Sequence, residues 1–247
     1  MLGKLFKEVI INIFMSILRV DKIFLVGVIL SLIYWIWYNF ISPTPQIFYY
    51  VLWIVVFGLF FYLCKDRIKT YFKSIKVSYF YKFLIIGLLI ILLEEIFAAL
   101  FNHLSEGFNF SLYLVRILQF WLLNIIIFSV WFIVWYQLLS RYRYSQREVF
   151  WLAGITGLFM EGIIYSIFSN PLYFILMLLP MIYVYGIIIS VPFWSIMDMN
   201  KSKKFVKNRI LLYILSIIII LIFVYLTGII VELLKVQYPS LFPPKFD

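Results

Sequence analysis

Three glutamates lie inside long hydrophobic stretches of this sequence, where ionisable side chains are rare. Glu94 and Glu95 are adjacent in the run LIILLEEIFAAL, and Glu161 lies in the run GLFMEGIIY. A carboxylate at the centre of a bilayer costs about 2.5–3.5 kcal/mol on insertion scales, so such residues usually face the protein interior and take part in function. Carboxylates in such a place can bind a metal ion, activate water or carry protons.

The spacing of small residues indicates which way Glu161 faces. Gly154, Gly157 and Glu161 follow the i, i+3, i+7 spacing of one helical face, and small residues allow two helices to approach closely. Glu161 and the pair Glu94–Glu95 each lie about twelve residues from the N-terminal end of their stretch. Basic residues precede both stretches, so these two ends lie on the same side of the membrane, and all three glutamates are at a similar depth near the midplane. The pattern therefore predicts one site that combines them.

Other polar side chains can join this site. Asn102 shares a helical face with Glu95, Tyr165 follows Glu161 by one turn, and Arg116 lies in the next hydrophobic stretch. His103, the only histidine, lies near the outer end of the stretch that holds the glutamate pair. We interpret Glu94, Glu95 and Glu161 as candidate catalytic residues and, with His103, as candidate ligands of a divalent metal cofactor. Asn102, Arg116 and Tyr165 would be the polar support, and further polar groups nearby are Gln119, Asn124, Tyr183 and Tyr185.

Several functions fit these residues at this stage. A membrane enzyme would use the carboxylates to bind a metal or activate water. A transporter or channel component would use them along a proton or ion path, beside a helix loosened by Pro180. In a non-catalytic scaffold, protonated glutamates or a pair with Arg116 would lock the helices together or meet a partner.

The elements that position these residues are membrane-spanning helices. Hydrophobic residues make up 66% of the 247 residues, charged residues only 13%, and the mean hydropathy is +1.07. A soluble domain has about 25% charged residues, and a chain of this size could not bury so much apolar surface in one core. The sequence predicts an all-α, polytopic transmembrane bundle that forms a single domain over 1–247.

A bilayer core of about 30 Å requires roughly 20 apolar residues in a helix. Seven stretches meet this requirement, and residues 1–22 are typical of an amphipathic helix at the membrane surface. The stretch 65–82 reads as a basic interfacial helix between two spans. The seven predicted spans are 23–41, 47–64, 83–104, 112–139, 149–169, 171–194 and 210–235.

The distribution of basic residues predicts the orientation. Every Lys and Arg except Arg116, Lys235 and Lys245 falls in the N-terminal segment or in the connections after the second, fourth and sixth spans. Positive loops face the cytoplasm, so we expect a multi-pass protein of the cell membrane with a cytoplasmic N-terminus and an extracytoplasmic C-terminus. The net charge of +10 then reflects orientation, and no nucleic-acid partner is expected. The expected partners are the lipid bilayer and a membrane protein or a hydrophobic substrate.

The segment Glu94-Glu95-Ile96-Phe97, with Phe101 shortly after it, resembles the first motif of the CAAX-processing and bacteriocin-processing (CPBP) intramembrane proteases. The stretch from Ala153 to Tyr165 resembles a motif of the PrsW-type membrane proteases. The resemblance implies that Glu94 or Glu95 activates water and that Glu161 is a partner in the site. The chain departs from the CPBP pattern, because Ala99 stands where that family has Arg and the later histidines are missing.

Other catalytic motifs are absent from the sequence. It contains no Gly-rich phosphate loop and no His-Glu-x-x-His segment. Cys64 is the only cysteine, which excludes an intramolecular disulfide and a cysteine-based metal site. The intramembrane glutamates are therefore the feature on which a functional hypothesis depends.

Overall fold

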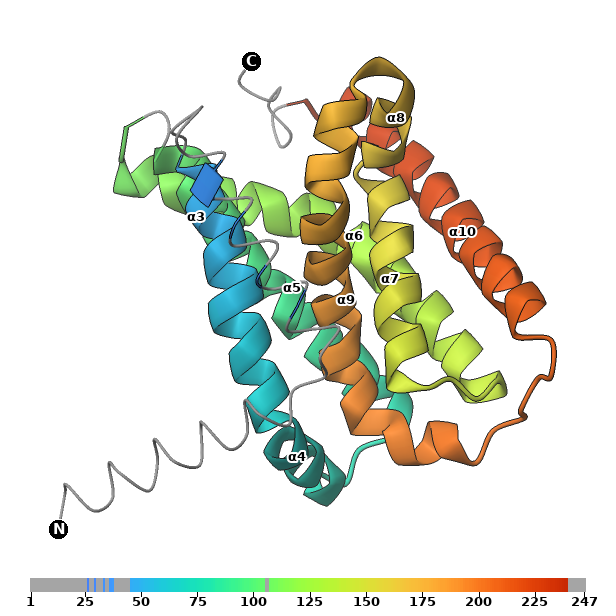
Figure 1. Cartoon of the computed structure of the whole chain (residues 1–247). Coiled ribbons are helices and arrows are strands. Elements are labelled where there is room, and N and C mark those ends of the chain that lie inside the picture. The colour runs from blue at the N-terminus through green and yellow to red at the C-terminus, as the bar shows by residue number, and fades with distance from the viewer. Residues whose placement is uncertain are drawn as a thin grey trace, which may run out of the picture.

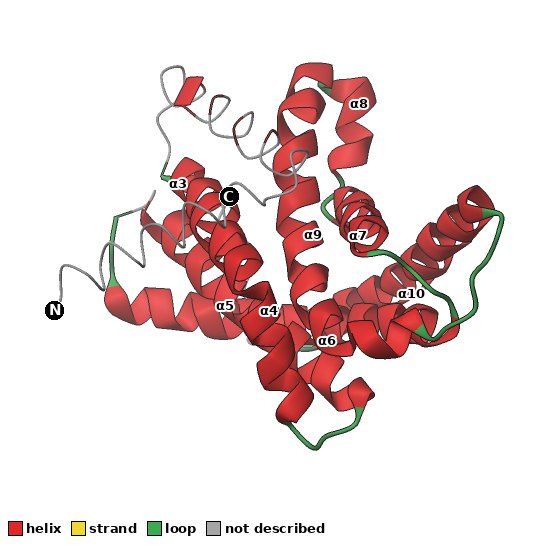
Figure 2. Cartoon of the chain, turned by 60° about the horizontal axis from the view of Figure 1, so that its bottom comes forward, coloured by secondary structure: helices red, strands yellow, loops and turns green. Residues whose placement is uncertain are grey.

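The computed structural model of this chain describes residues 45–104 and 107–239, together with positions 26, 29, 33, 36 and 37. The described residues form a bundle of helices joined by short loops (Figures 1 and 2). In chain order the elements are α3 (Gln46–Tyr50), the π-helix η1 (Val51–Gly58), α4 (Leu59–Ser74), α5 (Tyr79–Leu104), α6 (Phe110–Arg141), α7 (Gln146–Met160), the 3-10 helix η2 (Ile163–Tyr165), α8 (Ser166–Ser169), α9 (Pro171–Lys201) and α10 (Arg209–Gln237).

Five helices of the described region are long and apolar enough to cross a membrane. They are Phe48–Ser74, Tyr79–Leu104, Phe110–Arg141, Pro171–Lys201 and Arg209–Gln237. A sixth span exists if the pair Gln146–Met160 and Ile163–Ser169, which is bent by 72°, counts as one. The polytopic helical bundle is therefore confirmed. The predicted interfacial helix 1–22 and nearly all of the predicted first span lie outside the described residues, so the seven-span count stays a prediction.

Two predicted elements differ from the structure. The predicted fifth span, 149–169, is not a continuous helix, because α7 ends at Met160 and the chain turns at Gly162. The predicted interfacial helix 65–82 is not separate either, since α4 continues the preceding span without interruption to Ser74. The start of α4 is apolar and its end is basic, and no helix-breaking residue separates the two parts.

Side-chain caps mark where several helices begin. Asn109, Asn170 and Asn208 each accept a hydrogen bond from a backbone N–H three residues later, at 3.2, 3.1 and 3.1 Å. Ser145 and Glu148 form a reciprocal capping box at the start of α7. These caps satisfy N–H groups that the first helical turn leaves without a partner, and they fix the helix starts next to the loops.

Helix α9 forms the centre of the bundle. It is the most buried of the spanning helices and packs mainly against α7 and α5, which lie on either side of it in Figure 1. It continues as one helix through both Pro180 and Pro192. Helix α10 packs against α6 and α7. This arrangement lets α5, α6, α7, α9 and α10 surround a common space.

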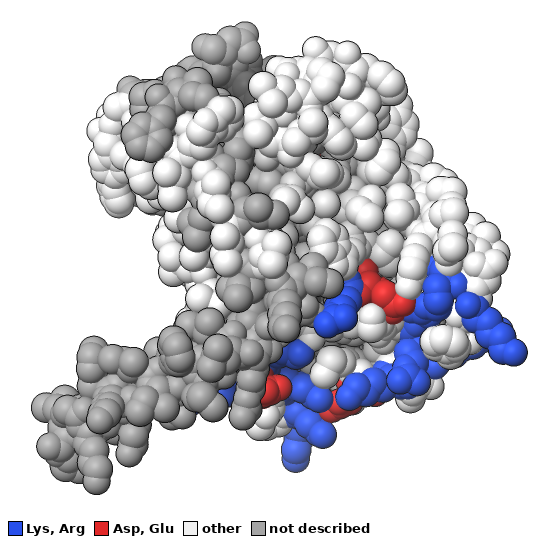
Figure 3. Space-filling model, viewed as in Figure 1, with Lys and Arg blue, Asp and Glu red and all other residues white. Residues whose placement is uncertain are grey.

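The basic residues gather at one end of the bundle, which we call the basic end. It consists of the segments 65–82, 141–147 and 201–209, which include helix ends as well as the loops between them. Figure 3 shows Lys and Arg along the lower edge of the face in view, while the upper part of that face carries almost none. The described part of the chain therefore agrees with the charge distribution that the sequence analysis used for orientation.

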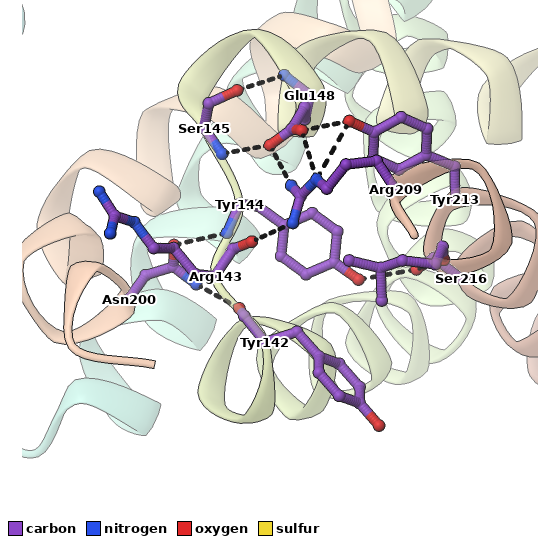
Figure 4. A network of polar contacts seen from close by, with 10 residues as sticks. Tyr142, Arg143, Tyr144, Ser145, Glu148, Asn200, Arg209, Tyr213 and Ser216 are labelled. Carbon is purple, nitrogen blue, oxygen red and sulfur yellow. Dashed lines mark hydrogen bonds and ion pairs between the residues drawn. The ribbon is translucent and has the colours of Figure 1, made fainter. Parts of the chain in front are cut away.

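A polar clasp holds the loops of the basic end together (Figure 4). The side-chain amide of Asn200, which is 1% exposed, donates to the carbonyl oxygens of Leu139 and Tyr142 at 2.7 and 2.8 Å. Its oxygen accepts the backbone N–H of Tyr144 at 3.0 Å. One buried side chain therefore ties the end of α9 to the loop between α6 and α7.

A second part of the clasp joins α7 to α10. Arg209 contacts the carboxylate of Glu148 at two points, 2.5 and 3.0 Å, and donates to the carbonyl oxygen of Arg143 at 2.9 Å. The hydroxyl of Tyr213 also donates to Glu148. Such two-point contacts between Arg and a carboxylate are among the stronger polar interactions in proteins, so the basic end forms a rigid base for the bundle.

We expect Asn200→Ala to destabilise the protein. The substitution leaves two buried carbonyl groups and one N–H without their partner, and each unsatisfied group costs roughly 1–3 kcal/mol. The apparent melting temperature in detergent should fall by several degrees. The control is Ser202→Ala, which removes an exposed hydroxyl at the same helix end. Equal melting temperatures for the two variants would contradict the role given to Asn200.

Candidate functional site

A cavity of about 470 Å³ lies between the helices in the half of the bundle away from the basic end. We call it the carboxylate cavity, because Glu94, Glu95 and Glu161 all line it. The structure thus brings together the three glutamates that the sequence analysis placed at a common depth. The other lining residues are Tyr49, Tyr50, Ala98, Phe101, Asn102, Phe120, Leu123, Asn124, Ile127, Phe128, Met181, Val184, Tyr185, Ile188, Gly228, Val231, Glu232 and Lys235.

Each of the three carboxylates accepts a hydrogen bond from an uncharged side chain on another helix. The hydroxyl of Tyr49 on α3 donates to Glu94, and the amide of Asn124 on α6 donates to Glu95. The hydroxyl of Tyr185 on α9 donates to Glu161. Buried carboxylates require such partners, because an unpaired polar group in an apolar interior is costly. Donors on three helices, α3, α6 and α9, therefore hold the orientation of three acidic groups on α5 and at the end of α7.

The glutamates differ in burial. Glu94 and Glu95 are 8% and 7% exposed, whereas Glu161 is an exposed residue and lines the same cavity. Glu161 is close enough to interact electrostatically with both Glu94 and Glu95. Like charges at close range in a low-dielectric interior repel strongly, so three ionised carboxylates are unfavourable together. The cavity therefore gathers three acidic groups within electrostatic range of one another.

Close packing of α7 on α9 positions Glu161. A Cβ atom on Gly154 would lie 2.6 Å from the carbonyl oxygen of Ile182, and one on Gly157 would lie 2.2 Å from Cγ of Tyr185. Only glycine permits this approach, which the spacing of small residues before Glu161 predicted. Tyr185 packs directly on Gly157 and donates to Glu161 one turn later, so the helix contact and the polar contact depend on each other.

Glu161 lies at the point where α7 ends and the chain turns. Glu161 caps the helix, and Gly162 follows with a φ of +69°, a left-handed conformation that glycine adopts without strain. The following helical segment is bent by 72° relative to α7. Helix C-termini carry partial negative charge, which adds to the negative potential of the cavity.

Aromatic rings pack against one another around Tyr185, which lines the cavity. Phe128 stacks on Tyr185 with ring centroids 6.3 Å apart, and Trp131 meets the same ring edge-on at 5.7 Å. Glu232 and Lys235 on the last turns of α10 also line the cavity and form an ion pair of 2.6 Å. The polar part of the cavity therefore extends from the level of Glu94 towards the end of α10.

Two of the three predicted supporting residues, and the predicted metal ligand His103, do not line the carboxylate cavity. Arg116 on α6 is absent from its lining, and Tyr165 is 72% exposed on the turn after Gly162. His103 is buried, and its Nε2 accepts the backbone N–H of Asn109 at 2.7 Å, so it joins the end of α5 to the start of α6. Asn102 is the one predicted supporting residue that lines the cavity.

Several residues of the site are not predicted by the sequence. Tyr49, Glu232 and Lys235 come from helices that lie far from the glutamate pair in the sequence, and no local spacing connects them to it. Asn124 and Tyr185 were named only as polar groups nearby. Among the described residues, no group of three or more His, Cys, Asp or Glu side chains is arranged to hold a metal ion. The expected metal site of Glu94, Glu95, Glu161 and His103 therefore gains no support.

We expect Gly157→Ala to weaken both the helix contact and the site. The added methyl group would displace the ring of Tyr185, and overpacking of this kind typically costs about 1–3 kcal/mol. The apparent melting temperature should fall below that of the unmodified protein. In the control, Gly228→Ala, the added atom has no neighbour within 4 Å and the residue becomes a better helix former. If the Gly157→Ala variant is as stable as the control, this result contradicts the close contact between α7 and α9 at Gly157.

Comparison with known proteins gives no relative for this chain. No family model matches the sequence, and neither a curated protein nor a solved structure matches it.

Proposed function

We propose that this chain is an integral membrane hydrolase of the protease type, in which glutamates activate water inside the carboxylate cavity. One observation supports the proposal most directly: Glu94, Glu95 and Glu161 line one cavity, and the side chains that donate to them are two tyrosines and an asparagine. Uncharged donors orient a carboxyl group without fixing it in the ionised state. The resemblance of the glutamate-pair segment to the CPBP proteases agrees with this chemistry.

Carboxyl groups that share protons can catalyse hydrolysis without a metal or a histidine. Two neighbouring carboxyl groups favour a state in which one is protonated and the other ionised. In our proposal an ionised glutamate of the Glu94–Glu95 pair takes a proton from water while the water oxygen attacks an amide carbonyl carbon. The proton then passes by way of the Glu161 carboxyl group to the leaving nitrogen as the C–N bond breaks, and a carboxylic acid and an amine are released.

The rest of the cavity suits an apolar substrate segment. Its volume falls within the usual range of ligand sites, roughly 300–1,000 Å³. Phe101, Phe120 and Leu123 line one part of it, and Met181 and Ile188 line another. We therefore propose a membrane-associated polypeptide as the substrate, bound with a hydrophobic stretch beside the glutamates.

The hydrolase proposal is tested with the purified protein in lipid nanodiscs and a library of hydrophobic peptides. Mass spectrometry identifies any cleaved bonds. At least one of Glu94→Gln and Glu95→Gln should remove the base and lower the cleavage rate at least about 100-fold, the usual size of a general acid–base contribution. Glu161→Gln should lower the rate by a similar factor. Glu232→Gln at the cavity end is the matched control and should retain most of the rate. Absence of cleavage by the unmodified protein, or equal cleavage by all variants, would contradict the proposal.

A second candidate is a proton-coupled transporter, and the break at Glu161 favours it. Transporters often carry discontinuous helices beside their binding sites, with helix ends contacting the ion. The same variants distinguish the two functions in proteoliposomes that contain a pH-sensitive dye. Proton flux that Glu161→Gln abolishes, without peptide cleavage, would favour transport over hydrolysis.

We also propose that the basic end faces the cytoplasm, so that the carboxylate cavity lies in the extracytoplasmic half of the membrane. The single cysteine allows a direct test in a Cys64→Ser background. We expect Ser111→Cys, near the start of α6, to react with a membrane-impermeant maleimide on intact cells. Ser202→Cys at the basic end should react only after permeabilisation. The reverse pattern would invert the proposed orientation.

A further inference from the structure

A second cavity, of about 340 Å³, lies in the half of the bundle that holds the basic end. We call it the slot. It is formed by η1 and α4, the start of α7 and the second half of α9. Its lining residues are Gly58, Phe61, Tyr62, Ser145, Gln146, Arg147, Phe150, Trp151, Tyr183, Ile187, Ser190 and Trp194. It shares none of these residues with the carboxylate cavity.

The slot is long and mostly apolar. On α9 its lining runs from Tyr183 to Trp194, a length of about 16 Å at the rise of an α-helix. That length is close to half the thickness of a bilayer core, about 15 Å. Phe61, Phe150 and Ile187 line its walls. These dimensions suit one hydrocarbon chain from one leaflet.

Two polar groups in the lining residues of the slot have no partner within the described part of the chain. The hydroxyl of Ser190 and the indole N–H of Trp194 are buried there without a hydrogen bond from or to any described residue, and each belongs to a residue that is only 3% exposed. Serine in a helix commonly satisfies its hydroxyl on a carbonyl of the preceding turn, so an unpaired Ser190 is unusual. Buried donors of this kind require an acceptor, and an ester oxygen is one that suits them.

Positive groups surround the end of the slot nearest the basic end. Ser145, Gln146 and Arg147 line it at the N-terminus of α7, where helix geometry favours anions. Lys65 donates to the side chain of Gln146, and its ammonium lies 6.0 Å from the ring centroid of Trp194. An anion at this point would meet Arg147, Lys65 and the helix end together.

We propose that the slot binds one anionic phospholipid from the leaflet at the basic end. The phosphate lies at Arg147, Lys65 and the start of α7, the ester groups accept from Trp194 and Ser190, and one acyl chain fills the apolar part. This site is independent of the proposed hydrolase, because it is built from other residues. The protein then binds one lipid molecule at a defined site, in addition to being surrounded by the lipids of the bilayer.

Native mass spectrometry of the purified, delipidated protein tests the proposal with phosphatidylglycerol and phosphatidylcholine of equal chain length. We expect one tight phosphatidylglycerol site and no matching site for phosphatidylcholine. Arg147→Gln and Lys65→Gln should each weaken binding roughly fivefold, because a basic residue near anionic lipid contributes about 1 kcal/mol. Arg67→Gln is the control, since Arg67 is an exposed basic residue on α4 that does not line the slot.

A second arm tests the acyl chain. Ser190→Leu fills the slot without changing its charge and should weaken phosphatidylglycerol binding at least tenfold, while far-ultraviolet circular dichroism verifies that the variant is folded. Glycerophosphoglycerol, which has the head group but no chains, should not compete. Equal binding of both phospholipids, an Arg67→Gln loss as large as that of Arg147→Gln, or competition by the free head group would each overturn the proposal.

Discussion

The close approach of α7 to α9 is the contact on which the candidate site depends. At Gly154 and Gly157 the two helices meet with no room for a side chain, and Tyr185 fills the space against Gly157. The same tyrosine donates to Glu161 where α7 ends. A wider separation of these helices would remove the partner of Glu161 and disrupt the aromatic packing of Phe128 and Trp131 on Tyr185. The geometry of the site at Glu161 therefore depends on how closely α7 packs against α9.

The hydrogen bonds of the three glutamates explain how the bundle tolerates acidic groups at this depth. Tyr49, Asn124 and Tyr185 supply donors from three different helices, which offsets the cost of burial without a permanent ion pair. Cationic partners would hold the carboxylates ionised, whereas neutral donors leave their protonation free to change. Hydrolysis and proton transport both require that freedom, and a purely structural lock does not.

Local patterns predicted the features that depend on neighbouring residues in the sequence. The apolar stretches predicted the helices, and the spacing of Gly154, Gly157 and Glu161 predicted the face of α7 that meets α9. The break was missed although Gly162 directly follows Glu161, a common signal for a helix end. Tyr49 and Glu232 reach the cavity from helices distant in sequence, which no spacing rule encodes. Arg116, Tyr165 and His103 were predicted to join the site as polar residues within or near the predicted spans, and the structure places them outside the cavity lining.

The central claim is that Glu94, Glu95 and Glu161 act as one coupled group of carboxyls. Infrared spectroscopy of the purified protein measures this directly, because protonated carboxyl groups have a C=O stretching band whose intensity can be followed with pH. The account predicts that Glu161→Gln changes the pH at which the remaining carboxyl signal titrates, and that Glu94→Gln and Glu95→Gln do the same. If each substitution removes one component and leaves the rest of the titration unchanged, the glutamates are independent and the account is contradicted.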